Sequence, residues 1–209
     1  MKLTPKIYFE KVPSSLDMEI RSELYHTNEF TFAVAVILSA QATDKKVNKV
    51  TPALFAIADT PQKMLKLGEE GLKEHIKVIS FFNNKAKSIL RLSLALGDSG
   101  LPHNRDALMK LPGIGQKTAN VIMNVLWGEP TIGVDTHVFR NAHRYRWVSE
   151  DANTPEKVEA QLMKIIPEKY HSIANHVMVL HGRYICKALR PKCSECPVAP
   201  WCDAKDKTI

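Results

Sequence analysis

The sequence is organised around one stretch near its middle, Leu111-Pro112-Gly113-Ile114-Gly115-Gln116-Lys117-Thr118-Ala119. Two of its glycines stand two residues apart, and glycine adopts a positive φ and leaves no Cβ between the backbone and a ligand. Residues 105–110 are compatible with a short helix that Asn104 can cap. Residues 117–127 carry apolar side chains on one face and end at Gly128. The stretch therefore predicts a helix, a glycine hairpin and a second helix.

The start of the second helix is a candidate phosphate site. The first N–H groups of a helix have no acceptor within it, and the helix dipole adds positive charge there. A turn without side chains lets an anion approach these groups closely. An ordinary helix–helix turn needs glycine for the same geometric reason, so the hairpin alone leaves both interpretations open.

A second motif, Val134-Asp135-Thr136-His137-Val138-Phe139-Arg140, follows the first one along the chain. Asp135 precedes apolar residues at helical spacing, which predicts that it caps the start of a helix. Lys117 stands at the start of the helix after the hairpin, where the positive end of the dipole favours a neutral amine. Taken singly, Lys117 could be a solvated helix residue and Asp135 only a cap.

All four cysteines lie near the end of the sequence, in the order Cys186-x6-Cys193-x2-Cys196-x5-Cys202. In a reducing compartment such clustering favours a metal site over disulfide bonds. The spacing has one C-x-x-C pair flanked by two single cysteines, whereas zinc ribbons usually have two such pairs. Four thiolates in a compact loop can hold zinc or a [4Fe–4S] cluster, and the spacing alone leaves that choice open.

The composition indicates a soluble globular protein. The chain has 209 residues, a formal net charge of +7 and a pI of about 9.2, and such a balance favours a polyanionic partner, although many basic proteins bind none. The N-terminus has no apolar segment typical of a signal peptide. No apolar run approaches the roughly 20 residues needed to span a bilayer. We therefore expect no membrane association and a cytoplasmic, nucleoid-associated location.

The apolar pattern predicts an all-α fold, because period-2 alternation is almost absent. Residues 29–40 are nearly continuously apolar and predict a central buried helix, after which Asp44 is expected to cap the next one. Three Thr-Pro pairs predict helix starts at residues 4–5, 60–61 and 154–155. Leu16, Ile20 and Leu24 have helical spacing, but two prolines and two serines precede them, so residues 13–27 remain undecided.

The motifs resemble those of the helix-hairpin-helix DNA glycosylases, most closely the endonuclease III family. The resemblance extends from Leu38-Ser39-Ala40-Gln41-Ala42-Thr43-Asp44 through the hairpin and the Asp135 motif to the four cysteines. It implies an all-α, two-domain helix-hairpin-helix glycosylase fold. Residues 26–130 would form a helical barrel domain, and residues 1–25 and 131–209 a helical iron–sulfur domain. It also implies that Cys186, Cys193, Cys196 and Cys202 bind a [4Fe–4S] cluster, which we expect to be structural.

The resemblance further implies a bifunctional DNA glycosylase and AP lyase of base excision repair that removes oxidised pyrimidines. Lys117 would be the nucleophile that attacks C1′ and forms a Schiff base, and β-elimination would then cleave the abasic site on its 3′ side. Asp135 would activate Lys117 or stabilise positive charge on the sugar. A lysine at this position sets the chain apart from the adenine-removing relatives. The alternatives are a mismatch-specific glycosylase and a non-catalytic helix-hairpin-helix DNA-binding protein.

The expected partner is double-stranded DNA with damaged bases or abasic sites, bound by a monomer. Glycosylases flip the damaged base out of the duplex, and Gln41 is the candidate that fills the space left behind, although a loop glutamine could simply be solvated. The other predicted DNA-binding residues are Gly113, Ile114, Gly115, Gln116, Thr118, Arg190 and Lys192. Gln116 stands where the family usually has Arg, while Ser80 and Phe82 stand where Gly and Tyr are common.

Overall fold

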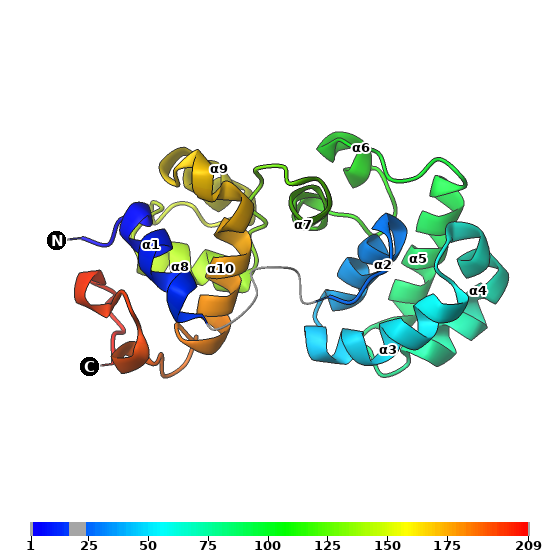
Figure 1. Ribbon diagram of the computed structural model, residues 1–209, viewed down its shortest axis with the longest axis horizontal. Coiled ribbons are helices and arrows are strands. Elements are labelled where there is room, and N and C mark those ends of the chain that lie inside the picture. Colours follow the sequence, from blue (N-terminus) through cyan, green and yellow to red (C-terminus); the bar gives the residue numbers. More distant parts are fainter. Residues whose placement is uncertain (1, 17–23, 209) are drawn as a thin grey trace. The chain divides into compact units, whose positions relative to one another are not determined.

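The computed structural model describes residues 2–16 and 24–208, and within these ranges every regular element is a helix. The α-helices are α1 (Pro5–Ser15), α2 (Glu29–Ser39), α3 (Asp44–Ile57), α4 (Pro61–Ile76), α5 (Phe82–Leu96), α6 (Arg105–Met109), α7 (Gln116–Trp127), α8 (Thr136–Arg144), α9 (Pro155–Ile165) and α10 (His171–Tyr184) (Figure 1). Three short 3-10 helices lie at Glu168–Tyr170, Cys193–Glu195 and Ala199–Trp201. The expected all-α fold is confirmed.

Contacts divide the chain into two units, residues 1–21 with 128–209 and residues 22–127. We call them the first and the second unit. The domain boundaries implied by the resemblance, at residues 26 and 130, stay a prediction. Ile20, which the sequence left undecided, lies outside the described residues.

The second unit is built around α2, which packs against α3, α5 and α7 (Figure 1). Nine of the 11 residues of α2 are buried, as its continuous apolar sequence predicts. The helix begins with a reciprocal cap, because Asn28 Oδ1 accepts from the Thr31 N–H at 2.9 Å and Thr31 Oγ1 accepts from the Asn28 N–H at 2.9 Å. The next helix is capped by Thr43 rather than Asp44, which is the first helical residue.

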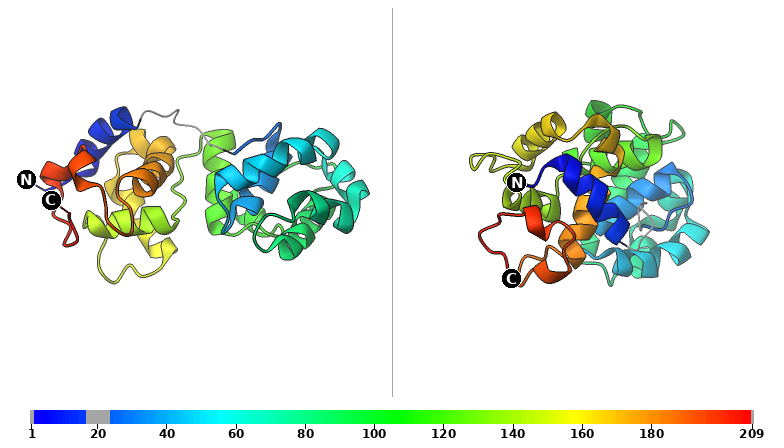
Figure 2. Two further views of the ribbon diagram at one scale, coloured as in Figure 1. Left: turned by 90° about the horizontal axis from the view of Figure 1, so that it is seen from below. Right: turned by 60° about the vertical axis from the view of Figure 1, so that its left-hand side comes forward.

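The first unit joins α1 to the C-terminal third of the chain. In it, α10 packs against α1 and α8, and both views of Figure 2 place the C-terminal loop beside α1. Buried aromatic rings connect these elements, since Tyr8 lies 5.2 Å from Trp147 between ring centroids and Trp147 Nε1 donates to the Leu3 carbonyl at 2.9 Å. Lys11 Nζ lies 5.0 Å from the centre of the Trp201 ring. The N-terminal helix is therefore part of the core that supports the cysteine loop.

Among the helices of the described residues, none has both the length and the apolar character required to cross a membrane.

Candidate functional site

The glycine hairpin connects α6 to α7 and is anchored in the core of the second unit. Gly113 has φ +81°, and a Cβ built there would lie 3.1 Å from Ser88 Cβ and 3.2 Å from Ile37 Cδ1. The positive φ therefore favours glycine at this position, and a Cβ would be in tight contact with both neighbours. Ile114 is buried, and its N–H donates to the Leu111 carbonyl at 3.2 Å. Its side chain thus fixes the hairpin to the core, while Gly113 remains at the surface.

The start of α7 presents backbone donors next to an exposed lysine. Among the described residues, the N–H groups of Gly113, Gly115 and Thr118 have no hydrogen-bond acceptor. Lys117 is the second residue of α7 and is exposed. Such a helix start suits an anion, because several N–H groups and the positive end of the dipole point the same way. An amine beside a bound phosphate can react with the attached sugar.

Asp135 is the N-cap of α8, as the sequence predicts. Its Oδ1 accepts from the His137 N–H at 2.8 Å and from the Val138 N–H at 2.9 Å. The side chain is half-buried, and a carboxylate is stabilised at this end of a helix. Lys117 belongs to the second unit and Asp135 to the first. Each is therefore held at a helix start by the local structure of its own unit.

Two residues near the ends of helices in the second unit have strained backbones and exposed side chains. Gln41 follows α2 with φ +53°, and Phe81 precedes α5 with φ +59° and 62% of its surface exposed. Non-glycine residues in this left-handed region often lie at functional sites. The sequence predicts a role for Gln41 but does not single out Phe81, since two adjacent phenylalanines do not reveal which one is exposed. Phe82 packs against the core of the unit.

The four cysteines surround one cavity of the first unit. All four are half-buried and free of disulfide bonds, and the same cavity is also lined by Arg144, Tyr145, Ile185, Pro191 and Val198. In the described part of the chain, no three metal-binding side chains lie close enough to share a single ion. A [4Fe–4S] cluster takes one thiolate on each of its four irons, so its ligands need not meet at one point. The donor set and its arrangement around a common cavity fit such a cluster.

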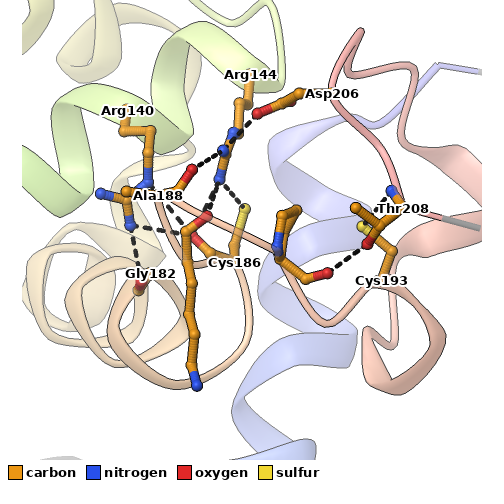
Figure 3. A network of polar contacts seen from close by, with 10 residues as sticks. Arg140, Arg144, Gly182, Cys186, Ala188, Cys193, Asp206 and Thr208 are labelled. Atoms are coloured by element: carbon orange, nitrogen blue, oxygen red, sulfur yellow. Dashed lines mark hydrogen bonds and ion pairs between the residues drawn. The ribbon is translucent and has the colours of Figure 1, made fainter.

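Helix α8 holds the cysteine loop through two arginines (Figure 3). Arg140 Nη2 donates to the carbonyls of Gly182 at 2.7 Å and Cys186 at 2.9 Å, and Arg144 Nη1 donates to Cys186 Sγ at 3.5 Å. Arg144 also forms an ion pair with Asp206. Hydrogen bonds to a ligand sulfur orient it and stabilise the thiolate. The helix that Asp135 caps is thus joined directly to the cysteine loop.

A buried histidine forms a second hydrogen-bonded contact to the cysteines. His181 Nδ1 lies 3.1 Å from the Tyr8 hydroxyl oxygen and 2.9 Å from that of Tyr145, and its Nε2 lies 3.4 Å from Cys196 Sγ. Burial lowers the pKa of His181 to about 4 and raises the pKa of the Cys196 thiol to about 11. A neutral ring carries one N–H, so His181 donates through one ring nitrogen and accepts through the other, and in either tautomer it connects the tyrosines to Cys196. Sequence reasoning missed His181, because its partners are distant in the chain.

The two predicted phosphate ligands of the basic C-terminal loop, Arg190 and Lys192, have different surroundings. Arg190 is exposed, with φ +50°, and no hydrogen bond or ion pair joins its side chain to another described residue. Lys192 Nζ lies 2.8 Å from a Glu195 carboxylate oxygen. The two predicted phosphate ligands therefore differ, since Glu195 partly neutralises the charge of Lys192.

Known proteins share these features over most of the chain. A family model described as the HhH-GPD superfamily of base excision DNA repair proteins matches residues 34–168, and one described as the iron–sulfur binding domain of endonuclease III matches residues 186–202. Endonuclease III of Rickettsia conorii is 53% identical over 186 residues, which cover 88% of each chain. The chain belongs to the endonuclease III family. It is a base excision repair enzyme, a DNA glycosylase with AP lyase activity, and its four cysteines bind a [4Fe–4S] cluster.

A second relative and a solved structure of endonuclease III are similar to this chain over nearly its whole length. Endonuclease III of Escherichia coli is 43% identical over 189 residues, covering 89% of each chain. A solved structure of a trapped covalent intermediate of endonuclease III with DNA superposes with a TM-score of 0.86, at 42% identity and 96% coverage of both chains. A thermostable thymine-DNA glycosylase has a TM-score of 0.80 at 20% identity, covering 95% of each chain, and this likeness concerns the fold alone.

Proposed function

We propose that this enzyme removes oxidised pyrimidines from double-stranded DNA and cleaves the resulting abasic site on its 3′ side, with Lys117 as the nucleophile. The observation that carries the proposal is the exposed amine of Lys117 at the start of α7, directly after the hairpin. A relative solved as a trapped covalent intermediate with DNA supports a covalent step.

The proposed reaction proceeds through a Schiff base. The neutral amine of Lys117 attacks C1′ of the sugar, the glycosidic C–N bond breaks, and the base leaves after taking up a proton. The opened sugar forms a Schiff base, which acidifies C2′. Loss of a C2′ proton then breaks the bond between C3′ and the phosphate oxygen, and water hydrolyses the Schiff base to release the enzyme. Asp135 accepts the proton of the amine or stabilises positive charge on the sugar.

The hairpin and the start of α7 are the proposed phosphate site. The backbone of Gly113, Gly115 and Thr118 would donate to phosphate oxygens, with Gln116 beside them. Ile114 would contribute by anchoring the hairpin, because its side chain is buried. Such contacts fix the register of the enzyme on DNA without reading its sequence.

Gln41 and Phe81 are the proposed fillers of the space left by the flipped base. The amide of Gln41 can hydrogen-bond the partner base, and an exposed aromatic ring such as Phe81 can stack between bases. Both side chains are exposed in the second unit. We assign this unit to the helical barrel domain and the first unit to the iron–sulfur domain, whose cluster holds the C-terminal loop in shape. We propose that the enzyme acts as a monomer on nucleoid DNA in the cytoplasm.

The substrate is tested with a panel of duplexes that each carry one lesion. We expect base release and a nick at ring-saturated pyrimidines such as thymine glycol, and little release from undamaged mismatches. Preferential release from mismatches would favour a mismatch-specific glycosylase. Binding without any release or nick would favour a non-catalytic DNA-binding role and contradict the proposal.

Arg190 is expected to contribute more to DNA binding than Lys192. Arg190→Glu should weaken binding to undamaged duplexes of all sequences alike and reduce the slope of log K against log salt by about 1 or more. Lys192→Glu makes the same change of charge and is the matched control. We expect a smaller effect from it, because Glu195 already partly neutralises Lys192. Salt titrations of both variants test this, and a larger effect of Lys192→Glu would contradict it.

A further inference from the structure

A buried lysine lies in the core of the second unit. Lys85, in the first turn of α5, is only 6% exposed. Lysine is rarely buried without partners that compensate for the lost hydration of its charge. Both polar partners of Lys85 are backbone carbonyl oxygens, and burial lowers the pKa of its ammonium group. The proposed chemistry makes no use of this cation, so its position needs another explanation.

The two carbonyls belong to the end of α2, immediately before Gln41. Lys85 Nζ donates to the Leu38 carbonyl at 2.8 Å and to the Ala40 carbonyl at 2.5 Å. The intervening Ser39 carbonyl accepts from the Ala42 N–H at 3.0 Å. The last carbonyls of a helix have no intrahelical donor, and a cation there interacts favourably with the helix dipole. Lys85 therefore satisfies the end of α2 and fixes the path of the chain into the next residue.

That next residue, Gln41, has an unfavourable backbone conformation. Its φ of +53° is in the left-handed region, where non-glycine residues persist only if the surrounding structure holds them. The Gln41 side chain is exposed, so core packing does not hold it. The restraint on its backbone comes from the adjoining residues, and the Ala40 carbonyl is bound by Lys85.

The same face of α5 also supports the glycine hairpin. Ser88 follows Lys85 by three residues and so lies on the same side of the helix. A Cβ on Gly113 would lie 3.1 Å from Ser88 Cβ and 3.2 Å from Ile37 Cδ1. One helix face thus contacts the loop of Gln41 through Lys85 and the hairpin through Ser88.

We propose that Lys85 is a positioning residue that holds Gln41 in the backbone conformation needed to fill the space left by a flipped base. The inference rests on the proposed role of Gln41. Lys85 does not touch DNA, and it acts through the end of α2. Its loss therefore impairs base excision from a duplex, where a partner base must be held. It spares nicking of a single-stranded abasic site, where no partner base exists.

The test compares Lys85→Met with Lys87→Met. Lys87 is an exposed lysine of the same helix, so both variants lose one positive charge, but only Lys85→Met loses the bonds to the two carbonyls. We expect Lys85→Met to lower single-turnover base excision from a lesion duplex by about tenfold or more, since a misplacement of about 1 Å can cost about 10²-fold. Nicking of a single-stranded abasic oligonucleotide should stay within about twofold. Lys87→Met should leave both rates within about twofold.

A double-mutant cycle separates this inference from the proposed function. Gln41→Ala alone tests the filling role, and an unchanged duplex rate would overturn that role and the inference with it. If Gln41→Ala does slow duplex excision, Lys85→Met should slow it little further in that background. Fully additive effects, or an equal loss on single-stranded DNA, would overturn the role of Lys85 alone.

Two further variants control for a folding defect of Lys85→Met. Lys85→Arg retains a charged donor and should recover at least half of the lost duplex activity. If Lys85→Met fails to melt cooperatively, Lys85→Gln replaces it, because the glutamine amide can still donate to one carbonyl. We expect this variant to lose an intermediate part of the base-excision rate, and only on duplex DNA. A full loss in the folded Lys85→Arg variant, or no loss in the folded Lys85→Gln variant, would contradict the proposal.

Discussion

Replacement of Lys117 by glutamine is expected to abolish both strand nicking and the borohydride trapping of a covalent DNA adduct. An amide is not nucleophilic and cannot form a Schiff base, so both base release and β-elimination lose their covalent intermediate. Glutamine keeps a similar length and a good helix propensity at this exposed position of α7. The melting temperature should therefore stay close to that of the wild type, and both activities should fall below detection.

The matched control is Lys110→Gln, which removes the charge of an exposed lysine on the other side of the same hairpin. Both variants lose one unit of charge, so a general loss of DNA attraction would affect them alike. Only Lys117→Gln should lose trapping when the DNA concentration is raised to saturation. An adduct that still forms with Lys117→Gln would identify another amine as the nucleophile and contradict the proposed chemistry.

The helix ends near the site could be predicted from the sequence because their signals are local. Asn104 Oδ1 accepts from the Ala107 N–H at 2.8 Å, and Asp135 caps α8, both as expected. The predicted cap of α3 was wrong by one residue. Threonine and aspartate are both good caps, so two adjacent candidates cannot be separated by residue type, and the structure uses Thr43.

The sequence contains a local signal for the unusual environment of Lys85. The apolar face of α5 contains Ile89, Leu92 and Leu96, and position 85 continues that face at helical spacing. A lysine on an apolar face indicates either a side chain that reaches solvent or a buried cation with partners. The sequence could not decide between them, because the partners belong to the backbone of α2.

The surroundings of the cysteines could not be predicted, because they combine residues from distant parts of the chain. Tyr8 and His181 are separated by 173 positions and meet only after α1 packs against α10. No local periodicity encodes such a pair. The spacing of the cysteines left zinc and iron–sulfur open, and the match of residues 186–202 to the iron–sulfur domain resolved that choice.

Replacement of Asp135 by asparagine is expected to separate the two steps of the reaction. Base release breaks a stable glycosidic bond while positive charge develops on the sugar, and a nearby carboxylate stabilises that charge. Its loss should slow base release by about 10²-fold or more. A pre-formed abasic site has already lost its base and can open to an aldehyde, which an amine attacks more readily. Asp135→Asn should therefore retain much more of the nicking at abasic sites than of the base release.

Asparagine is the informative substitution because Asp135 also has a structural role. Its Oδ1 accepts two backbone N–H groups at the start of α8, and an asparagine carbonyl can accept the same bonds. Asp135→Ala loses the cap as well as the charge, and should lower stability by about 1 kcal/mol. The measurement is single-turnover base release and abasic-site nicking for both variants, with melting curves as the control. If a folded Asp135→Asn enzyme lost base release and abasic-site nicking to the same extent, separate roles would be contradicted. Lys117 would then depend on the Asp135 carboxylate in both steps.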